Sequence, residues 1–573
     1  MNRIRIALLA VVVILVGLVA YGWFSRPAVQ DAASSAFSAE RVVNDIEVIS
    51  RNHHSVAHPQ ERAEVRDYLV SRLGELGADT VRLFEYKSLT GPENKHVTYT
   101  FDATNVLATF APGHATEQTT YLLMVAHYDS RYSQPIAKSD TVWSYGAADD
   151  GYGVGVILET VAQALKYRAD WKQGVKVLFT DAEEVGMKGM KAMWENNREE
   201  FNDVGFMINI EARGPFGPAL LFETSPGNDK VMELYESAAE YPFTYSLTTV
   251  VYGFMPNFTD FTIVKDEIPG MNFSTIADIN HYHTDLDNFS NVNPRSIQHY
   301  GSQVVPVVHS YLTDERYSSR DSLLSDSDTI NFTLPLIGLF NFTKGEYIVL
   351  NSVVLLLFVI ALVLEVLRGR VQLRKVLRGT LRALLAAIAA LAAGELVAIV
   401  ACLVTGVQFK PFGIVQGIPF DNAAMAVSAV VMVLMVVWVH IGQRRKAVNG
   451  TSNSLRKSAK SSAALAVAAN KLYAALLLMA LLSLLLLMFI NENLMFFIPL
   501  TLATFAVILY RLTRLKLWFL LAIALILLHA FSFLYALAMA LTIGALGAVL
   551  MLAILDVLVV VPLVDMYVTR KPF

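Results

Sequence analysis

The sequence has only one cysteine in 573 residues, Cys402, which lies inside an apolar segment. The polar part of the chain that precedes residue 345 therefore has neither a disulfide nor a thiol nucleophile, which excludes cysteine-based catalysis there. Because there is no disulfide framework to interpret, the cysteine content does not indicate the redox compartment of the protein.

Charged residues are also scarce. They make up 17% of the chain, against 54% hydrophobic residues, and this composition is apolar for a soluble protein. The formal net charge is only −4, and the chain before residue 345 has no basic stripe interleaved with aromatic residues. We therefore expect no nucleic-acid partner. The composition carries no signal for the oligomeric state.

The hydrophobic residues are unevenly distributed, and the chain is too long for one ordinary core. Up to about residue 345 the sequence mixes charged, polar, Gly and Pro residues, whereas later blocks such as LYAALLLMALLSLLLLMFI are long enough to cross a bilayer. We predict an N-terminal transmembrane anchor at 1–24, an extracytoplasmic domain at 25–345 and an all-α transmembrane domain at 346–573. The lipid bilayer is thus a predicted partner.

The first segment indicates the orientation of the chain in the membrane. Arg3 and Arg5 precede about eighteen apolar residues, which is typical of an anchor whose basic end stays in the cytoplasm. A cleaved signal peptide remains the alternative, because the following AVQDAASSA offers small residues. With an uncleaved anchor, the domain at 25–345 lies outside the cytoplasm, in a bacterial periplasm or, alternatively, in an organelle lumen. The absence of disulfides favours the bacterial periplasm.

Basic and non-basic loops alternate after residue 345. The basic loops are RGRVQLRKVLRGTLR, QRRKAVNGTSNSLRKSAKSS, RLTRLK and TRKPF, whereas GVQFKPFGIVQGIPFDN and NEN are poor in Lys and Arg. This alternation predicts about seven spans after the polar domain and about eight in all. The count depends on dividing 517–568 into two spans, since nine spans would move the C-terminus to the other side.

The polar domain has the pattern of an α/β fold. Periodicity predicts helices and strands that alternate along the chain, which implies a mostly parallel central sheet flanked by helices. In such sheets, ligands bind at the carboxyl ends of the strands. The predicted helices are 61–78, 152–167 and 188–201, and the predicted strands are 104–112, 120–130, 174–184 and 204–214.

Acidic residues and histidines follow these predicted strands. Each motif alone has an ordinary interpretation as a turn, a helix cap or a solvated strand end. Together, several carboxylates at one edge of a sheet would repel one another unless a cation neutralised them. Histidine and carboxylate ligands without cysteine fit zinc, and one shared carboxylate suits two ions about 4 Å apart. The residues are His127, Asp129, Asp149, Asp150, Asp181, Glu183, Glu184, Glu211 and His283.

The order of these motifs resembles a known family. H-x-D, D-D-G-x-G, E-E-V-G, I-E-A-R-G and Y-H-T occur in this order within about residues 40–315, as in the co-catalytic zinc peptidases of clan MH. That group includes bacterial leucyl aminopeptidase, glutamate carboxypeptidase and glutaminyl cyclase. The layout of a peptidase domain followed by membrane spans resembles, more narrowly, the vacuolar membrane proteases and endoplasmic reticulum metallopeptidases, with bacterial relatives. The resemblance implies a zinc-peptidase fold and a peptide substrate.

The resemblance also implies a set of metal ligands for two Zn²⁺ per chain. Asp149 would bridge the two ions. His127 and Glu211 would complete the shell of one ion, and Glu184 and His283 would complete that of the other.

Other residues receive roles around the metals from the same resemblance. Glu183 would be the general base that takes a proton from the attacking water. If the strand continues through AEEVG, its two glutamates point in opposite directions, and the family pattern decides which of them is the base. Asp129 would accept a hydrogen bond from His127 and so orient it, and Asp150 would belong to the loop after the bridging carboxylate.

Two further residues are candidates for contacts with the substrate. The hydroxyl of Tyr282 would stabilise a tetrahedral oxyanion, although a packing tyrosine is an equally good interpretation. Arg213 would bind a substrate carboxylate or a peptide carbonyl, with a structural salt bridge as the alternative. His281 shares a face with His283 if INHYHT is extended, but its position does not match the family pattern.

Aminopeptidase activity is the preferred prediction. Only Arg213 among the basic residues is near a motif, whereas a carboxypeptidase needs a cluster of basic residues for the terminal carboxylate. Glutaminyl cyclases keep a single zinc, and the full ligand set here favours hydrolysis. An inactive receptor ectodomain is disfavoured because the base and all ligands are present. A transporter is disfavoured because few ionisable residues occur in the spans, with Glu395 the most suggestive.

Overall fold

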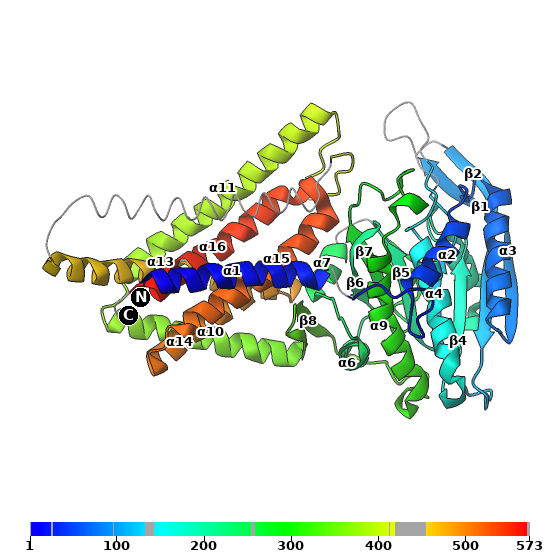
Figure 1. Ribbon diagram of the computed structural model, residues 1–573, viewed down its shortest axis with the longest axis horizontal. Coiled ribbons are helices and arrows are strands. Elements are labelled where there is room, and N and C mark those ends of the chain that lie inside the picture. Colours follow the sequence, from blue (N-terminus) through cyan, green and yellow to red (C-terminus); the bar gives the residue numbers. More distant parts are fainter. Residues whose placement is uncertain are drawn as a thin grey trace. The chain divides into compact units, whose positions relative to one another are not determined.

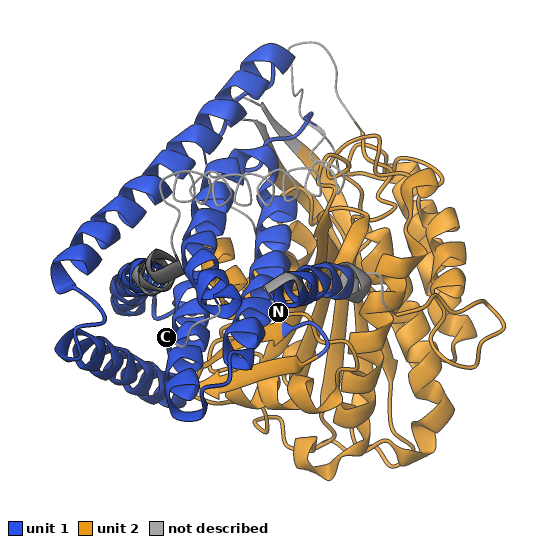
Figure 2. Cartoon of the chain, turned by 60° about the vertical axis from the view of Figure 1, so that its left-hand side comes forward, with its two compact units in different colours: residues 1–23, 334–336, 345–573 blue, residues 24–333, 337–344 orange. Residues whose placement is uncertain are grey.

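The computed structural model describes residues 2–24, 27–94, 97–131, 143–253, 258–411, 413–418 and 454–569. The chain divides into two compact units, which Figure 2 shows in different colours. The α/β unit consists of residues 24–333 and 337–344, and the helical unit consists of residues 1–23, 334–336 and 345–573.

A seven-stranded sheet forms the centre of the α/β unit, with the strand order β1-β2-β4-β3-β5-β7-β6 (Figure 1). Strand β3 pairs in parallel with β4 and β5, and β5 pairs in parallel with β7. The pairs β1–β2, β2–β4 and β6–β7 are antiparallel. The strands are β1 (Thr80–Asn94), β2 (Val97–Phe110), β3 (Tyr121–His127), β4 (Gly174–Thr180), β5 (Val204–Ala212), β6 (Phe216–Thr224) and β7 (Gly270–Ala277).

Helices cover both faces of this sheet. Alternate residues of β3 point into two separate cores, because side chains alternate across a strand. Leu122 and Met124 belong to a core that contains residues of α2, α3, α4, α6 and α9, whereas Leu123 and Val125 belong to a core that contains residues of α5 and α8. The helices are α2 (Ala39–Ile49), α3 (Pro59–Glu75), α4 (Gly151–Ala164), α5 (Lys188–Asn196), α6 (Asp229–Ala238), α7 (Ser246–Gly253), α8 (Asp260–Val264) and α9 (Pro294–Thr313).

This architecture confirms the predicted α/β fold with a mostly parallel central sheet. Strands β4, β5 and β7 are buried along their whole length, as the continuous apolar runs in the sequence indicated. The long antiparallel hairpin of β1 and β2 is an addition that the alternation of helices and strands did not predict. The strand expected over 174–184 ends at Thr180, so the acidic residues that follow lie in a loop.

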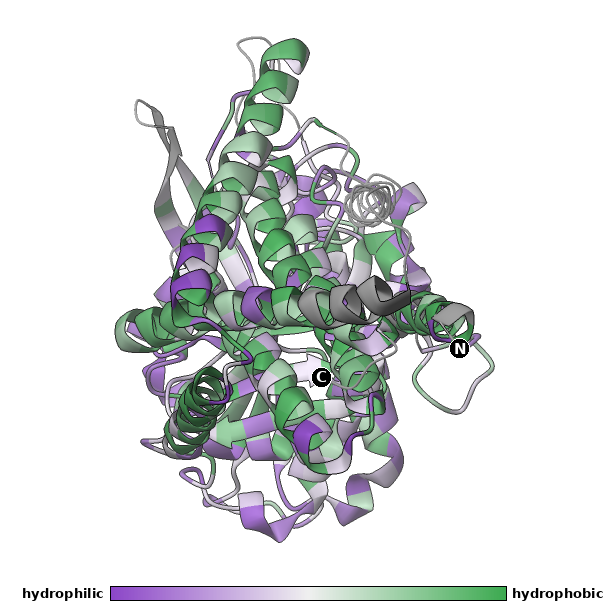
Figure 3. Ribbon diagram, turned by 90° about the vertical axis from the view of Figure 1, so that its left-hand side faces the viewer, coloured by the Kyte–Doolittle hydropathy of each residue, from purple (hydrophilic) through white to green (hydrophobic). Residues whose placement is uncertain are grey.

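The helical unit contains five segments long and apolar enough to cross a membrane, counted over the described residues only. Figure 3 shows the hydrophobic character of these helices, and the chain is a multi-pass membrane protein. The span predicted just before QRRKAVNG lies outside the described residues. The segments are Lys344–Leu367 (α10), Leu373–Thr405 (α11), Ala464–Ile490 (within α13, Ser454–Ile490), Leu494–Thr513 (α14) and Leu517–Val568.

The last of these segments is divided into two helices, and a further, shorter apolar stretch lies in the N-terminal helix. Leu517–Val568 is divided into α15 (Leu517–Leu541) and α16 (Leu546–Val568) by a short 3₁₀ turn at Thr542–Ala545. The N-terminal helix α1 (Asn2–Phe24) has a shorter apolar stretch, Ile4–Val19. The total number of spans and their orientation therefore stay predictions.

Small residues bring α11 and α16 close together. A Cβ atom on Gly394 would lie 2.5 Å from the Cα of Gly547, so the two backbones meet at this pair of glycines. A Cβ atom on Gly547 would also lie 2.5 Å from Oε1 of Glu395. Glu395, the residue that raised the possibility of transport, thus packs against the neighbouring helix as an assembly contact would.

A buried ion pair ties α3 to the sheet of the α/β unit. Nη1 of Arg62 lies 3.3 Å from Oδ1 of Asp181, and Nη2 donates a hydrogen bond to the carbonyl of Asp102 at 2.8 Å. Burial raises the pKa of Asp181 to about 6, and the charge of Arg62 opposes that increase. Because both side chains are buried, each needs the charge of the other.

We expect Arg62→Met to lower the free energy of unfolding by about 3–5 kcal/mol at pH 7, because it leaves the carboxylate of Asp181 buried without its cation. Arg66→Met is the matched control on the same helix, since Arg66 pairs with the exposed Asp67 and should lose only about 0–1 kcal/mol. Denaturant unfolding of the detergent-solubilised full chain measures both values. Equal losses in the two variants would contradict the role of the buried pair.

Candidate metal centre and active site

The candidate ligands meet because four parallel strands end at the same edge of the sheet. His127 is the last residue of β3, and Glu211 lies near the end of β5. Glu184 follows β4, and His283 follows β7. Asp149 lies in the loop before α4, where the side chain of Asp150 caps the helix by accepting a hydrogen bond from the N–H of Gly153 at 2.9 Å. Asp150 is thus the N-cap residue of α4.

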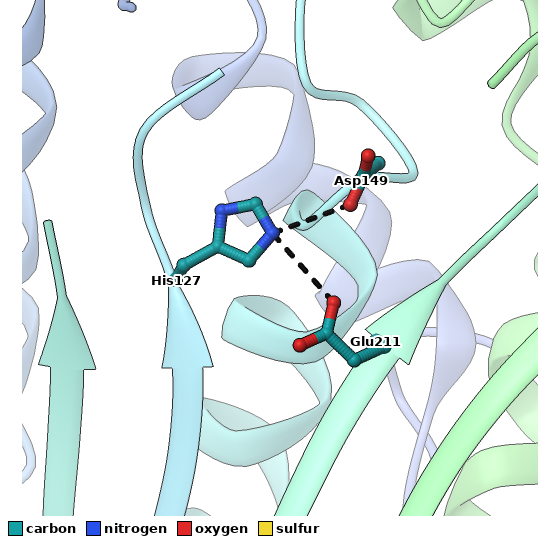
Figure 4. Close-up of side chains that lie close together, drawn as sticks. All are labelled: His127, Asp149 and Glu211. Atoms are coloured by element: carbon teal, nitrogen blue, oxygen red, sulfur yellow. Dashed lines mark hydrogen bonds and ion pairs between the residues drawn. The ribbon is translucent and has the colours of Figure 1, made fainter. Parts of the chain in front are cut away.

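The first group consists of His127, Asp149 and Glu211. Nε2 of His127 lies 3.2 Å from Oδ1 of Asp149 and 3.7 Å from Oε2 of Glu211. Figure 4 shows that the imidazole and both carboxylates point toward one another. All three residues are buried, and their ligand atoms lie within 4.8 Å of one another.

The second group consists of His283, Asp149 and Glu184. Nε2 of His283 lies 3.2 Å from Oδ2 of Asp149 and 3.1 Å from Oε2 of Glu184. Asp149 therefore offers one carboxylate oxygen to each group. Two candidate metal positions thus share a single carboxylate.

The donor atoms suit divalent cations. Nδ1 of His127 lies 2.9 Å from the carbonyl oxygen of Asp129, and a carbonyl oxygen only accepts hydrogen bonds, so Nδ1 carries the hydrogen. Nε2 then faces two carboxylate oxygens, an arrangement that either a proton on Nε2 or a bound cation can satisfy. Oε1 of Glu184 is buried and has no hydrogen-bond partner among the described residues. Zinc binds such nitrogen and oxygen atoms at about 2.0–2.2 Å, so two ligand atoms at a tetrahedral angle lie about 3.3–3.6 Å apart.

The shifts in pKa at this edge have the same electrostatic origin. Burial raises the pKa of Glu183 and of Glu211 well above the usual range of a glutamate, and neighbouring carboxylates add to the increase. Burial opposes protonation of His127, but the carboxylates of Asp129 and Asp149 raise its pKa well above the usual value. An environment that favours added protons to this degree also favours a bound cation.

Asp129 lies close to His127 through both its backbone and its side chain. Its carbonyl oxygen, at 2.9 Å, accepts from His127, whereas the nearer carboxylate oxygen lies 3.5 Å away. The carboxylate also accepts from the N–H of Glu183 at 2.9 Å and from that of Glu184 at 3.3 Å. Asp129 therefore contacts the histidine through its backbone and its side chain, and its carboxylate also holds the loop of the two glutamates.

The two glutamates lie in a loop, so the argument from strand alternation does not apply to them. Ala182 has a left-handed conformation with φ of 59°, which turns the chain immediately before Glu183. Glu184 then contacts His283, and the side chains of both glutamates line a cleft. The division of roles that the family pattern implied is thus compatible with the geometry of this loop.

Tyr282 and Arg213 lie beside the second group. The ring of Tyr282 stacks on His283 with centroids 3.6 Å apart, and the guanidinium of Arg213 lies 5.5 Å from the centroid of the Tyr282 ring. His281 is different, because residues 278–284 form turns and not an extended strand. Its Nδ1 lies 3.3 Å from a carboxylate oxygen of Asp278, and it belongs to neither metal group.

Two residues near the ligands were missed in the sequence. Nη1 of Arg131 lies 3.1 Å from Oε2 of Glu184 and also contacts the carbonyl oxygen of Glu184. Asp287 is buried and accepts from the N–H of Ala148 at 2.7 Å, from that of Asp149 at 3.4 Å and from Oγ of Ser144 at 2.9 Å. The only signal for Asp287 in the sequence is its place four residues after His283, in a run that contains other acidic residues.

The metal groups open onto a cleft of about 390 Å³, part of which is open to solvent. Acidic residues, aromatic residues and one arginine share its wall. The lining residues are Asp149, Glu183, Glu184, Glu211, Arg213, Phe222, Tyr252, Phe258, Thr259, Ser274 and Tyr282.

Residues 105–308 match the sequence model of peptidase family M28. The chain thus contains an M28 metallopeptidase domain that is related to endoplasmic reticulum metallopeptidases and vacuolar membrane proteases. It is 29% identical over 230 residues to endoplasmic reticulum metallopeptidase 1 of Mus musculus, which is 39% of this chain and 24% of the relative. It is 32% identical over 204 residues to a vacuolar membrane protease of Verticillium alfalfae, which is 34% of this chain and 18% of the relative.

The matches cover only part of these proteins. Among the curated relatives that the chain matches, including further vacuolar membrane proteases, the matched stretch makes up 18% to 32% of the relative's length. Among solved structures, a zinc aminopeptidase from Bacillus subtilis is similar with a TM-score of 0.38 and 13% identity, covering 51% of this chain and 99% of that one.

The hydrogen bonds of Asp287 lead to a prediction about metal retention. We expect Asp287→Ala to weaken zinc binding by about 10- to 100-fold, because the backbone that carries Asp149 loses the partner that positions it. Asp285→Ala is the matched control, since Asp285 is exposed and lies two residues away in the same loop. Competition between the purified full chain and a chelator of known affinity measures both. Unchanged affinity in Asp287→Ala would contradict this role.

Proposed function

We propose that this chain is a membrane-bound di-zinc aminopeptidase that removes N-terminal residues from peptides. The observation that carries the proposal is the carboxylate of Asp149, which offers one oxygen to each of two histidine and carboxylate groups. Membership of the domain in a metallopeptidase family supports the same conclusion.

Two zinc ions would be held by these residues. His127 and Glu211 would bind one ion, Glu184 and His283 would bind the other, and Asp149 would bind both. When bound, such ions polarise the scissile carbonyl and lower the pKa of water.

Glu183 is the proposed general base. It lines the cleft beside the ligands without belonging to either metal group, and its backbone is held by Asp129. Burial raises its pKa, which favours a carboxylate that accepts a proton from the attacking water and then delivers it to the leaving amine. Tyr282 also lines the cleft, where its hydroxyl would stabilise the negative charge on the carbonyl oxygen in the transition state.

The charges in the cleft favour an aminopeptidase over the other activities of this fold. Four carboxylates line it, and they suit the free amine of an N-terminal residue, whereas Arg213 is the only cationic residue among the lining residues described. A carboxypeptidase, the second candidate, draws support from Arg213 alone. Two full metal groups favour hydrolysis over the cyclase reaction, and the presence of a base favours an enzyme over an inactive receptor.

We further propose that the α/β unit lies outside the cytoplasm. The proposed layout keeps the anchor at 1–24, the peptidase domain at 25–345 and the transmembrane domain at 346–573. The basic loops after residue 345 support this orientation. The compartment would be the periplasm of a bacterium or the lumen of an organelle.

The base can be tested by Glu183→Gln. We expect kcat/KM for leucine p-nitroanilide to fall by about 10²- to 10⁴-fold, because the amide cannot accept the proton, while the zinc content stays unchanged. Glu236→Gln, an exposed residue of α6, is the control and should keep full activity. Chelation should abolish the hydrolysis and added zinc should restore it. Full activity of Glu183→Gln would refute the assignment of the base.

The orientation can be tested by cysteine labelling, because the chain has one native cysteine to remove. In a Cys402→Ala background expressed in bacterial cells, Ser290→Cys should react with a membrane-impermeant maleimide from outside the inner membrane. Lys375→Cys, an exposed residue at the beginning of α11, should react only after the inner membrane is permeabilised. The reverse pattern of labelling would show that the proposed orientation is wrong.

A further inference from the structure

The cleft contains a guanidinium group that has no counter-ion among the described residues. Nε and Nη2 of Arg213 are buried and make no hydrogen bond with the part of the chain that the structure describes. The backbone of Arg213 is nevertheless fixed, because its N–H donates to the carbonyl of Thr275 at 2.8 Å and lies 3.2 Å from Oγ of Ser274. The backbone of Arg213 is therefore fixed, while Nε and Nη2 of its side chain have no hydrogen-bond partner among the described residues.

A second unused donor lines the same cleft. The hydroxyl of Tyr252 in α7 is buried and has no hydrogen-bond partner within the described ranges. Its ring packs edge-on against Phe222, with centroids 4.9 Å apart. Burial raises the pKa of Tyr252 well above its ordinary value, so the hydroxyl stays protonated at neutral pH and is available as a donor.

The carboxylates near Arg213 are engaged elsewhere. Oε1 of Glu211 accepts from Asn209 at 3.1 Å, and Oε2 lies toward His127. Glu223 follows Phe222, a residue that lines the cleft. Its carboxylate pairs with Lys265 at 2.5 Å and accepts a hydrogen bond from Asn272 at 3.0 Å. The described residues thus supply no anion for Arg213, whose guanidinium lies over the ring of Tyr282, and its buried donors favour an anionic partner.

A carboxylate has the geometry that these donors require. The planar fork of a guanidinium binds both oxygens of a carboxylate at once, and a tyrosine hydroxyl can donate a further hydrogen bond. Phe222 and Phe258 add apolar surface to the same wall, which suits the methylene groups that precede a side-chain carboxylate.

We propose that Arg213 and Tyr252 bind a carboxylate of the substrate, so that the cleft selects peptides with an anionic group next to the bond that is cleaved. This inference rests on the proposed peptidase function. The carboxylate has two possible sources, which are the side chain of an N-terminal glutamate or aspartate and the free carboxyl terminus of a dipeptide.

Two pairs of substrates separate these sources. Glutamyl p-nitroanilide and glutaminyl p-nitroanilide differ only at the side-chain carboxylate, and leucyl-glycine and leucyl-glycinamide differ only at the terminal one. We expect the zinc-loaded full chain to prefer the anionic member of one pair by at least about tenfold in kcat/KM. In Arg213→Gln that ratio should fall close to one, in Arg213→Lys it should be partly kept, and in Tyr252→Phe it should fall about threefold or more.

The ratio is measured on a single sample, so a lower yield of folded variant does not change it. Arg295→Gln, an exposed arginine at the beginning of α9, is the matched control and should keep the ratio of the unaltered chain. The absence of a preference in both pairs, or an unchanged ratio in Arg213→Gln, would overturn the inference while leaving the peptidase function standing.

Failure of the peptidase function itself would look different, since none of the four compounds would be hydrolysed. In that case, the carboxylate site is tested by measuring the binding of amino acids to the same protein. Calorimetry compares L-glutamate with L-glutamine, and L-leucine with L-leucinamide. Tighter binding of one anionic member that is lost in Arg213→Gln supports the carboxylate site, and equal binding within both pairs overturns it.

Discussion

The carboxylate of Asp149 lies between two imidazoles that approach it from opposite groups, each at 3.2 Å. Two further carboxylates face these histidines, with Glu211 near His127 and Glu184 near His283. Such a cluster of carboxylates favours positive charge at this edge of the sheet, and the ligand atoms converge in two groups that suit divalent ions. The surrounding structure is organised to hold this arrangement.

That organisation comes from loops held by side chains other than the ligands. The carboxylate of Asp129 fixes the loop of Glu183 and Glu184, and Asp287 fixes the backbone at Asp149. The parallel strands bring the ligands to one edge of the sheet, and the hydrogen bonds of these two carboxylates position the loops that carry Glu184 and Asp149. A cleft lined by acidic residues, aromatic residues and one arginine adjoins the centre, and three of the candidate metal ligands are part of its lining.

Much of this could be predicted from the sequence, because period-2 and helical patterns are local and ordered motifs place ligands on strand ends. The α/β sheet and the apolar spans follow from such patterns, and the grouping of His127, Asp149 and Glu211 was implied by the resemblance to a peptidase family. The antiparallel hairpin, the loop at Glu183 and the backbone contact of Asp129 do not, because they depend on long-range pairing and on single residues such as Ala182. Arg131 and Asp287 carry no distinctive local pattern and appear only when the loops are folded.

The central claim is that two divalent ions sit on either side of Asp149. The most direct measurement is the zinc content of the reconstituted, purified full chain by elemental analysis, together with that of Asp149→Ala. The account predicts about two zinc ions per chain in the unaltered protein and a large loss in the variant. One zinc or none per chain after reconstitution, or an unchanged content in Asp149→Ala, would contradict it.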